Sequence, residues 1–189
     1  NIVVNNVVLS TGTLTHNGKL VIGRPGSLPL VQLGGFGQTV APGRFASVPT
    51  FDNTSYATQY NYLTSSTPYV LGASNEISAN TNTIFALTVA SHKGLTIDRN
   101  LTLVGSLIMT LGNLSIGNNN LTLGSGLTNI GTLTYTSGNI ICGATGTFTR
   151  WYNTTAAPTF LAAASQFPLG GLSDVRHAWV YLSATNALS

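Results

Sequence analysis

Five aromatic residues are the chain's best candidates for direct contact with a ligand. They are Tyr56, Tyr60, Tyr62, Trp151 and Trp179. Aromatic rings can bind carbohydrate by stacking on the apolar face of a sugar, so this set predicts a speculative glycan-binding surface. The same residue types also fill protein cores, and for the aromatics of residues 27–61 core packing is the favoured explanation because large rings dominate core burial.

Residues that could support catalysis or bind a metal do not form a recognisable set. The four acidic residues are isolated from one another: Asp52, Glu76, Asp98 and Asp174. Glycoside hydrolysis needs two carboxylates about 5–10 Å apart, and no spacing here predicts such a pair. The histidines also fall in three separate segments without metal-ligand spacing: His16, His92 and His177. We therefore expect no catalytic residue, no metal, no cofactor and no enzymatic activity.

The single cysteine, Cys142, occupies an apolar strand position, where a buried small hydrophobic side chain is the expected role. It can form no disulfide within the chain. A reactive thiol would need a neighbouring histidine or basic residue, and the sequence around Cys142 offers neither.

Charge is scarce. Charged residues make up 6% of the 189-residue chain, against roughly 25% in an ordinary soluble domain. The net charge of +3 comes from seven basic and four acidic residues. The basic residues are scattered rather than clustered, which argues against nucleic-acid binding. No apolar run approaches 18 residues, so we expect no membrane span.

The polar surface is supplied by Asn, Thr, Ser and Gly, a composition that suits strands and tight turns. Together with the low charge and single cysteine, it favours an extracellular or cell-surface location. The sequence begins in a strand-like segment without a Met or a signal peptide, and predicts a processed product or a piece of a longer polypeptide.

The region from residue 94 to 148 contains a repeat. Apolar-polar-apolar triplets begin at Leu95, Leu114 and Leu133, with 19 residues between successive starts. A second series begins at residues 101, 121 and 140, and a looser third series begins at 107 and 127 and closes near 147–148. Three short strands in each coil of 19–20 residues are typical of a parallel β-solenoid.

Stacking of the coils places Leu95, Leu114 and Leu133 in one inward column. An asparagine precedes each triplet of the second series, and we expect these residues to form a corner ladder through their side-chain amides: Asn100, Asn120 and Asn139. The alternative is a set of three antiparallel hairpins whose spacing is coincidental.

These patterns predict an all-β chain in four parts. Residues 1–22 are a first solenoid coil, and residues 23–86 are an aromatic-rich β excursion or cap with extra strands. Residues 87–148 are the regular solenoid, and residues 149–189 are an aromatic-rich β segment that acts as a cap or starts the next module.

The repeat resembles that of large secreted surface proteins of Bacteroidota-type bacteria. The residues that carry the resemblance are GLTI at 94–97, NLTL at 100–103 and LSIGNNNLTLG at 114–124. TFTRWY at 147–152, FPLG at 167–170 and FASVPTFDN at 45–53 are similar to other pieces of that group. The resemblance implies β-solenoid modules of long exported proteins that are often predicted to be adhesins or fibre-like structures. It carries no catalytic motif, and the C-terminal sorting domain common in the group is absent from this sequence.

The leading functional hypothesis is therefore a structural or adhesive component of the bacterial cell surface or extracellular matrix, built as a stacked β rod or fibre subunit. Its expected partners are other copies of itself or neighbouring modules of a longer chain, with surface glycans as a second class. The alternative is a carbohydrate-binding module that uses the five aromatics. A third hypothesis is an inactive remnant of a β-helix carbohydrate-active enzyme, which a groove that groups Asp98 with Glu76 or Asp174 would favour.

Overall fold

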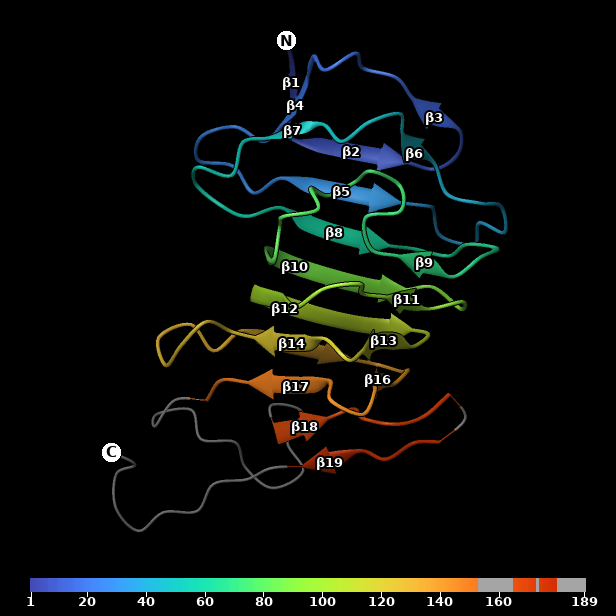
Figure 1. The fold of residues 1–189 in the computed structure, drawn as a ribbon, viewed down its shortest axis with the longest axis vertical. Helices are drawn as coiled ribbons and strands as arrows, with labels where there is room; N and C mark the ends of the chain where they lie inside the picture. The colour runs from blue at the N-terminus through green and yellow to red at the C-terminus, as the bar shows by residue number, and fades with distance from the viewer. Residues whose placement is uncertain (153–164, 173, 180–189) are drawn as a thin grey trace.

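The computed structural model describes residues 1–152, 165–172 and 174–179. It is nearly all-β, with 45% strand and 1% helix, which confirms the all-β expectation. The strands stack from the N-terminal end of the molecule toward the C-terminal end (Figure 1). Pairing is parallel everywhere except in the last strand pair.

Two parallel sheets make up most of the molecule. The larger has eight strands: β2 (Asn6–Leu9), β5 (Leu30–Leu33), β8 (Gln59–Tyr62), β10 (Thr83–Ala90), β12 (Leu101–Leu111), β14 (Asn120–Leu123), β15 (Thr132–Tyr135) and β17 (Thr147–Arg150). The second has four strands: β9 (Tyr69–Val70), β11 (Leu95–Thr96), β13 (Leu114–Gly117) and β16 (Ile140–Cys142).

Three smaller sheets lie at the two ends of the stack. At the N-terminal end, β1 (Ile2–Val4), β4 (Leu20–Ile22) and β7 (Thr50–Phe51) form one sheet, and β3 (Thr13–Leu14) pairs with β6 (Arg44–Phe45). At the C-terminal end, β18 (Gln166–Phe167) and β19 (Ala178–Trp179) form the antiparallel pair.

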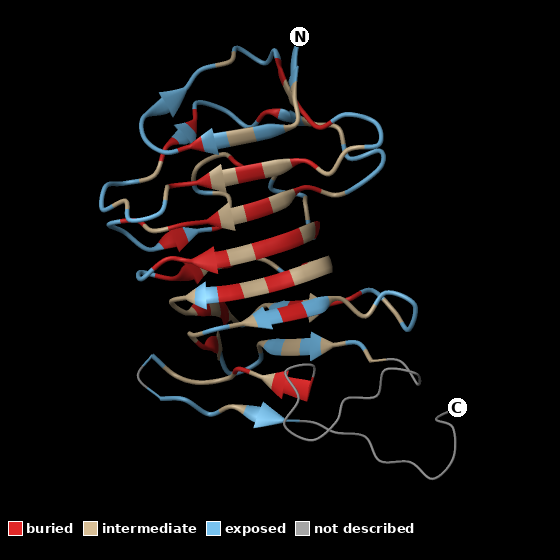
Figure 2. Cartoon of the chain, turned by 180° about the vertical axis from the view of Figure 1, so that it is seen from behind, coloured by how far each residue is buried: buried red, intermediate tan, exposed pale blue. Residues whose placement is uncertain are grey.

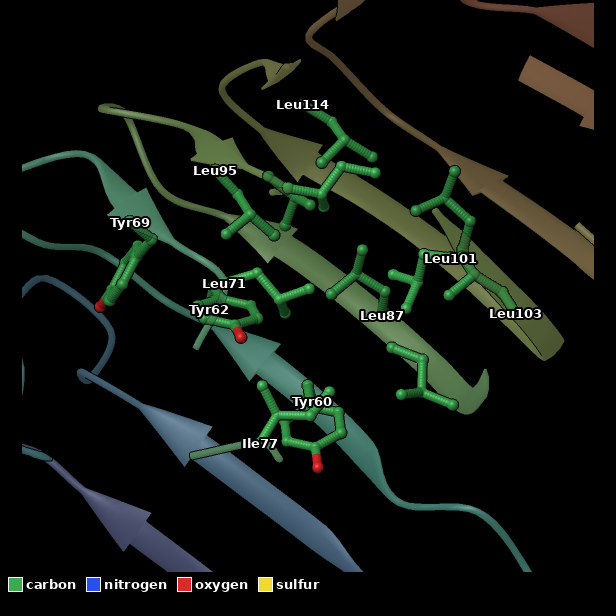
Figure 3. Close-up of a cluster of buried hydrophobic side chains, with 14 of the residues drawn as sticks. Tyr60, Tyr62, Tyr69, Leu71, Ile77, Leu87, Leu95, Leu101, Leu103 and Leu114 are labelled. Carbon is green, nitrogen blue, oxygen red and sulfur yellow. The ribbon is translucent and has the colours of Figure 1, made fainter. Parts of the chain in front are cut away.

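From β9 to β13 the chain alternates between the two main sheets and adds one layer to each on every visit. This path satisfies a general requirement, because parallel neighbours cannot be joined by a tight hairpin and need a long crossover connection. Here the strand of the other sheet serves as that crossover. Leu87, Leu95 and Leu114 therefore come from three different strands yet point into one interior (Figure 3).

The core consists of columns of inward side chains. Since successive residues of a strand face opposite sides, each strand contributes alternate positions, and Figure 2 shows that alternation of burial along the large sheet. Backbone pairing places one such column in register: Val31, Tyr60, Leu87, Leu107 and Leu133. All five side chains are buried, and they belong to a single hydrophobic cluster that includes the inward residues of both main sheets.

The predicted column is correct for its first two members and wrong for the third. Leu95 pairs with Leu114 as expected. Leu114, however, pairs with Ile140 on its other side, and Leu133 lies in the large sheet beside Leu107. The 19-residue spacing between positions 114 and 133 is therefore coincidental.

An insertion explains the error. Leu103 pairs with Leu123, and Ser106 pairs with Thr132, so three residues in one layer correspond to nine in the next. The six additional residues lie between β14 and β15, in residues 124–131. Leu127, expected to begin a strand, lies in this loop with 61% of its surface exposed, whereas Leu133 is 7% exposed.

Asparagines do occupy corners of the stack, but in two columns rather than one. The Asn100 side-chain oxygen accepts the backbone N–H of Asn120 at 2.8 Å, and the Asn120 side-chain oxygen accepts the Thr147 hydroxyl at 2.7 Å. Asn139 belongs to another corner, where its backbone N–H donates to the side-chain oxygen of Asn113 at 2.9 Å. The ladder bonds run from side chain to backbone or hydroxyl rather than from amide to amide.

Residues 23–86 contribute to the same large sheet. Their strands β5 and β8 pair in parallel with each other, and they lie between β2 and β10. Paired positions are 29 residues apart between β5 and β8, as for Leu30 and Gln59, because longer loops separate the strands. Tyr60 and Tyr62 take the inward positions that leucines occupy in later layers.

The insertion gives a direct test of the register. We expect Leu133→Ala to lower the free energy of unfolding by about 2–5 kcal/mol, because it leaves a cavity in an inward column. Leu127→Ala, in the exposed loop, should change it by no more than about 0.5 kcal/mol. Equilibrium denaturation of the two variants and the wild type measures the difference, and equal effects would contradict this register.

Candidate functional site

Two of the five predicted ligand-binding aromatics lie in the core. Tyr60 and Tyr62 are alternate residues of β8, so both face the interior, and both are buried (Figure 3). The Tyr62 ring lies edge-on to that of Tyr69, with 5.2 Å between centroids. Neither ring has a free face for a sugar, so the prediction that they bind a glycan is wrong for these two residues.

The other three predicted aromatics reach the surface, but they do not form one platform. Tyr56 precedes β8 and contacts Phe85 edge-on at 6.3 Å. Trp151 follows β17, which lies four strand positions from β8 in the large sheet, or roughly 19 Å at the usual strand spacing. Trp179 lies in β19 beside His177, with 6.0 Å between their centroids. Of these, Trp151 borders a cleft.

Glu76 is the one acidic residue with no exposed surface. Its Oε1 accepts the Tyr62 hydroxyl at 2.8 Å and the Gly72 backbone N–H at 2.5 Å, and its Oε2 accepts the Ser74 N–H at 3.0 Å. Three donors compensate the burial of this carboxylate and hold the turn that follows β9. Its arrangement is structural, because no substrate could reach it without opening the core.

The turn held by Glu76 closes over β6. The Phe45 backbone N–H donates to the Ser74 carbonyl at 2.9 Å, and the Asn75 side-chain amide donates to the Phe45 carbonyl at 2.9 Å. Nearby, Arg99 donates to the Ser78 carbonyl at 2.8 Å. The sequence shows Glu76 only as an isolated acid, and its partners could not be identified because they are mostly backbone groups.

The other acidic side chains also lack a second carboxylate. Asp98 forms a two-pronged ion pair with Arg99 at 2.7 and 3.0 Å, and Asp174 pairs with Arg176 at 2.7 Å. Asp52 accepts hydrogen bonds from Thr54, which lower the pKa of its carboxyl. In residues 1–152, 165–172 and 174–179, no group of three or more His, Cys, Asp or Glu could hold a metal ion.

The N-terminal end of the stack is the surface that the sequence did not identify. We call its first layer, formed by β1, β2 and β3, the N-terminal rung. Each of these strands is the last in its sheet, so its outer backbone edge has no strand beside it in the described part of the chain. Such an edge can pair with a strand from another molecule.

Inward side chains of the N-terminal rung are exposed where their partners one layer down are buried. Ile2 is 65% exposed, whereas Leu20, its pairing partner, is 6% exposed. Leu14 is likewise exposed above the fully buried Phe45. The hydrophobic core is therefore open at this end.

At the other end of the stack, the edge of β16 is occupied. The Ile140 backbone N–H donates to the Pro168 carbonyl at 2.7 Å, and the Gly170 N–H donates to the Ile140 carbonyl at 3.2 Å. Phe167 also packs against Phe148 of β17, with 5.5 Å between ring centroids. The two ends therefore differ, since residues 165–172 cover β16 and no comparable segment covers the N-terminal rung.

Comparison with protein-family models, with curated proteins and with solved structures finds no match for this chain. Within the described residues there is no helix that is long and apolar enough to cross a membrane.

The buried tyrosines predict a characteristic alkaline titration. Burial raises the pKa of Tyr69 to about 12 and raises the pKa values of Tyr60 and Tyr62 further, from the ordinary value of 10. The unfolded chain would release these protons near pH 10 while the folded chain keeps them. Folding stability should thus be constant below pH 10 and should decline as the pH rises above it.

Ultraviolet absorbance of tyrosinate measures this behaviour. In concentrated denaturant all seven tyrosines should ionise near pH 10, whereas in the folded protein at least three should ionise only as it unfolds. Tyr60→Phe should reduce the late phase by one tyrosine. Ionisation of all seven near pH 10 in the folded protein would show that Tyr60 and Tyr62 are accessible.

Proposed function

We propose that the chain is a structural or adhesive component that forms a β-solenoid rod and associates through its N-terminal rung. The observation that carries the proposal is the open core at that end of a stack of parallel strands. Ile2 and Leu14 continue columns whose next members, Leu20 and Phe45, are buried. A further layer on the rung would bury them in the same way.

The solenoid itself is supported by the chain path. Alternation between the two main sheets, with parallel pairing at each step, is what a coiled chain produces. The asparagine corners between successive layers support the same interpretation.

A second copy of this chain is the occupant we propose for the N-terminal rung. Head-to-tail stacking would require a free edge at the opposite end, but β16 is already hydrogen-bonded to residues 168–170. Two N-terminal rungs can instead meet about a two-fold axis, which joins identical surfaces and closes the assembly at two copies. The product is a rod of twice the length, with its covered ends outward.

An extracellular or bacterial cell-surface location is part of the proposal. It is supported by the low charge, the Asn- and Thr-rich composition and the resemblance of the repeats at 94–124 to those of secreted surface proteins. A stack held by backbone pairing and a hydrophobic core needs neither a disulfide nor a metal, which suits a rod exposed to changing surroundings.

The competing hypotheses lose specific support. A catalytic carboxylate pair would need Glu76 at a surface, and it is buried beneath Tyr62 and the turn at 72–74. A glycan platform built on Tyr60 and Tyr62 would need rings in solvent. Trp151 remains exposed, and it enters a separate argument below.

Analytical ultracentrifugation over a range of concentrations tests the association. We expect the wild-type chain to form a reversible dimer, and the double variant Ile2→Lys/Leu14→Lys to raise the dissociation constant at least about tenfold. Lysine on an edge strand opposes pairing because its charge cannot be buried there. Both positions are exposed, so the monomer should keep its β-sheet circular dichroism.

Val70→Lys is the matched control. Val70 is an exposed apolar residue of β9, away from the N-terminal rung, and the variant should dimerise like the wild type. A wild type that stays monomeric at every concentration would refute the association. Unlimited growth into fibres would instead indicate head-to-tail stacking, and would show that the head-to-head arrangement is wrong.

A further inference from the structure

The loop inserted between β14 and β15 forms one wall of a cleft whose other wall is Arg150, Trp151 and Tyr152. We propose that this cleft binds a carboxylated sugar, with Arg150 and Tyr152 as donors to the carboxylate and Trp151 as the stacking surface. The proposal goes beyond the rod function. It concerns the β17 end of the stack, so its test is independent of the N-terminal rung.

The insertion has a defined shape. Gly124 and Gly131 lie at its two ends, both with positive φ (89° and 65°), and a Cβ at Gly131 would lie 2.7 Å from the backbone nitrogen of Gly124. Two glycines are required for the ends to approach this closely. Within the loop, the Ser125 backbone N–H donates to the Asn129 carbonyl at 2.7 Å. Short loops with joined ends are frequently functional.

The strand geometry brings the second wall beside this loop. Since β14 and β17 are parallel neighbours, the loop after β14 and the residues after β17 leave the sheet on the same side (Figure 1). The Trp151 backbone N–H donates to the Leu123 carbonyl at 3.1 Å, which fixes Trp151 next to the start of the loop. The one six-residue departure from the repeat therefore lies against the one cluster of arginine and two aromatics.

Arg150 is a half-buried cation without an acidic partner. None of the four acidic side chains forms an ion pair with it, although all four lie in described residues. Its Nη1 donates to the Gln166 carbonyl at 2.6 Å, and its guanidinium lies over the rings of Tyr152 and Phe167 at 5.4 and 5.7 Å. Burial lowers the pKa of Arg150, which still remains charged. A desolvated guanidinium favours a carboxylate as its partner.

Two polar atoms in this cluster have no hydrogen-bond partner. They are Nε of Arg150 and the hydroxyl oxygen of Tyr152, and both are removed from water. Buried polar atoms in folded proteins are nearly always bonded, so each such exception calls for an explanation. Burial also raises the pKa of Tyr152, which keeps its hydroxyl protonated as a donor at neutral pH. A carboxylate with two oxygens could accept from both donors after a small side-chain adjustment.

The remaining surface favours a sugar over other carboxylates. Trp151 is 39% exposed, and Ile130 and Leu133 add apolar area, whereas Thr132 contributes a hydroxyl at the rim. An indole face beside a cation suits a ring with apolar C–H groups on one side and a carboxylate on its edge. The cleft volume of about 230 Å³ is below the roughly 300–1,000 Å³ of drug-sized pockets, so it fits a single sugar unit of a chain.

Tryptophan fluorescence can test the site directly. Trp179→Phe leaves Trp151 as the single tryptophan, so its emission reports on the cleft alone. We expect an oligomer of galacturonic acid to change this emission saturably, whereas the corresponding neutral galactose oligomer should have no effect. Sulfated galactose oligomers and poly-glutamate serve as the competing anions.

Four variants in the Trp179→Phe background separate binding from folding. Arg150→Gln should weaken galacturonate binding at least about tenfold, the usual cost of losing a charge-assisted donor. Thr132→Glu places a repelling charge at an exposed position and should weaken binding similarly without altering the thermal midpoint. Arg150→Lys should restore only part of the affinity, because lysine lacks the planar fork. Arg24→Gln removes a charge near the N-terminal rung and should change affinity less than twofold.

Several outcomes would overturn the proposal. Equal response to the acidic and neutral oligomers would exclude carboxylate recognition, and tighter binding of poly-glutamate would point to an acidic peptide. Tighter binding of the sulfated oligomer would show that the anion is a sulfate. Unchanged affinity in both Arg150→Gln and Thr132→Glu would place the binding elsewhere. Loss of dimerisation in the rung variants would leave these results unaffected, so the two proposals can fail separately.

Discussion

Parallel pairing of each layer with the next is the constraint on which the rest of the structure depends. A single layer has a few short strands and cannot enclose its inward side chains, so it is stable only between neighbours. Register then decides everything else, since a shift of one residue would turn every inward leucine toward solvent. The columns through Leu87, Leu107 and Leu133 exist because backbone bonds hold these residues one above another. The same dependence explains why the first layer, with a neighbour on one side only, leaves Ile2 and Leu14 exposed.

Sequence pattern predicted the elements of this stack better than their connections. Alternating apolar residues identified nearly all strands from 95 to 148, and the first pairs, Leu95 with Leu114 and Leu101 with Leu121, were correct. The error arose at Leu133, because a six-residue insertion combined with a change of strand series preserved a spacing of 19 by chance. Periodicity measures distance along the chain, and it cannot distinguish one coil with a loop from two shorter segments. Only the hydrogen-bonded register separates the two, through pairs such as Leu107 with Leu133.

The candidate sites were less predictable, for reasons that differ between residues. Tyr60 and Tyr62 looked like a surface row because the repeat cannot be followed in residues 23–86, so their inward orientation was hidden. Glu76 looked isolated because two of its three donors are backbone N–H groups, which no residue type reveals. The exposed rung follows from an absence of neighbours, and absence leaves no pattern in a sequence. Trp151 was identified correctly as an exposed aromatic, but its cation, Arg150, became significant only when no acid was found beside it.

Regular stacking also determines where recognition can arise. Along the middle of the stack, inward residues are committed to the core and backbone groups to neighbouring layers, so little remains to distinguish one layer from the next. Departures from regularity are therefore the places at which a ligand or partner can be recognised. Here they are the open N-terminal rung and the loop at 124–131, and both are made from residues that the core does not need. The loop can change in length without disturbing Leu123 and Leu133, which remain in their columns on either side of it. A rod of this kind can thus acquire a binding site at almost no cost in stability, provided that glycines such as Gly124 and Gly131 allow the chain to leave its strand and return to it.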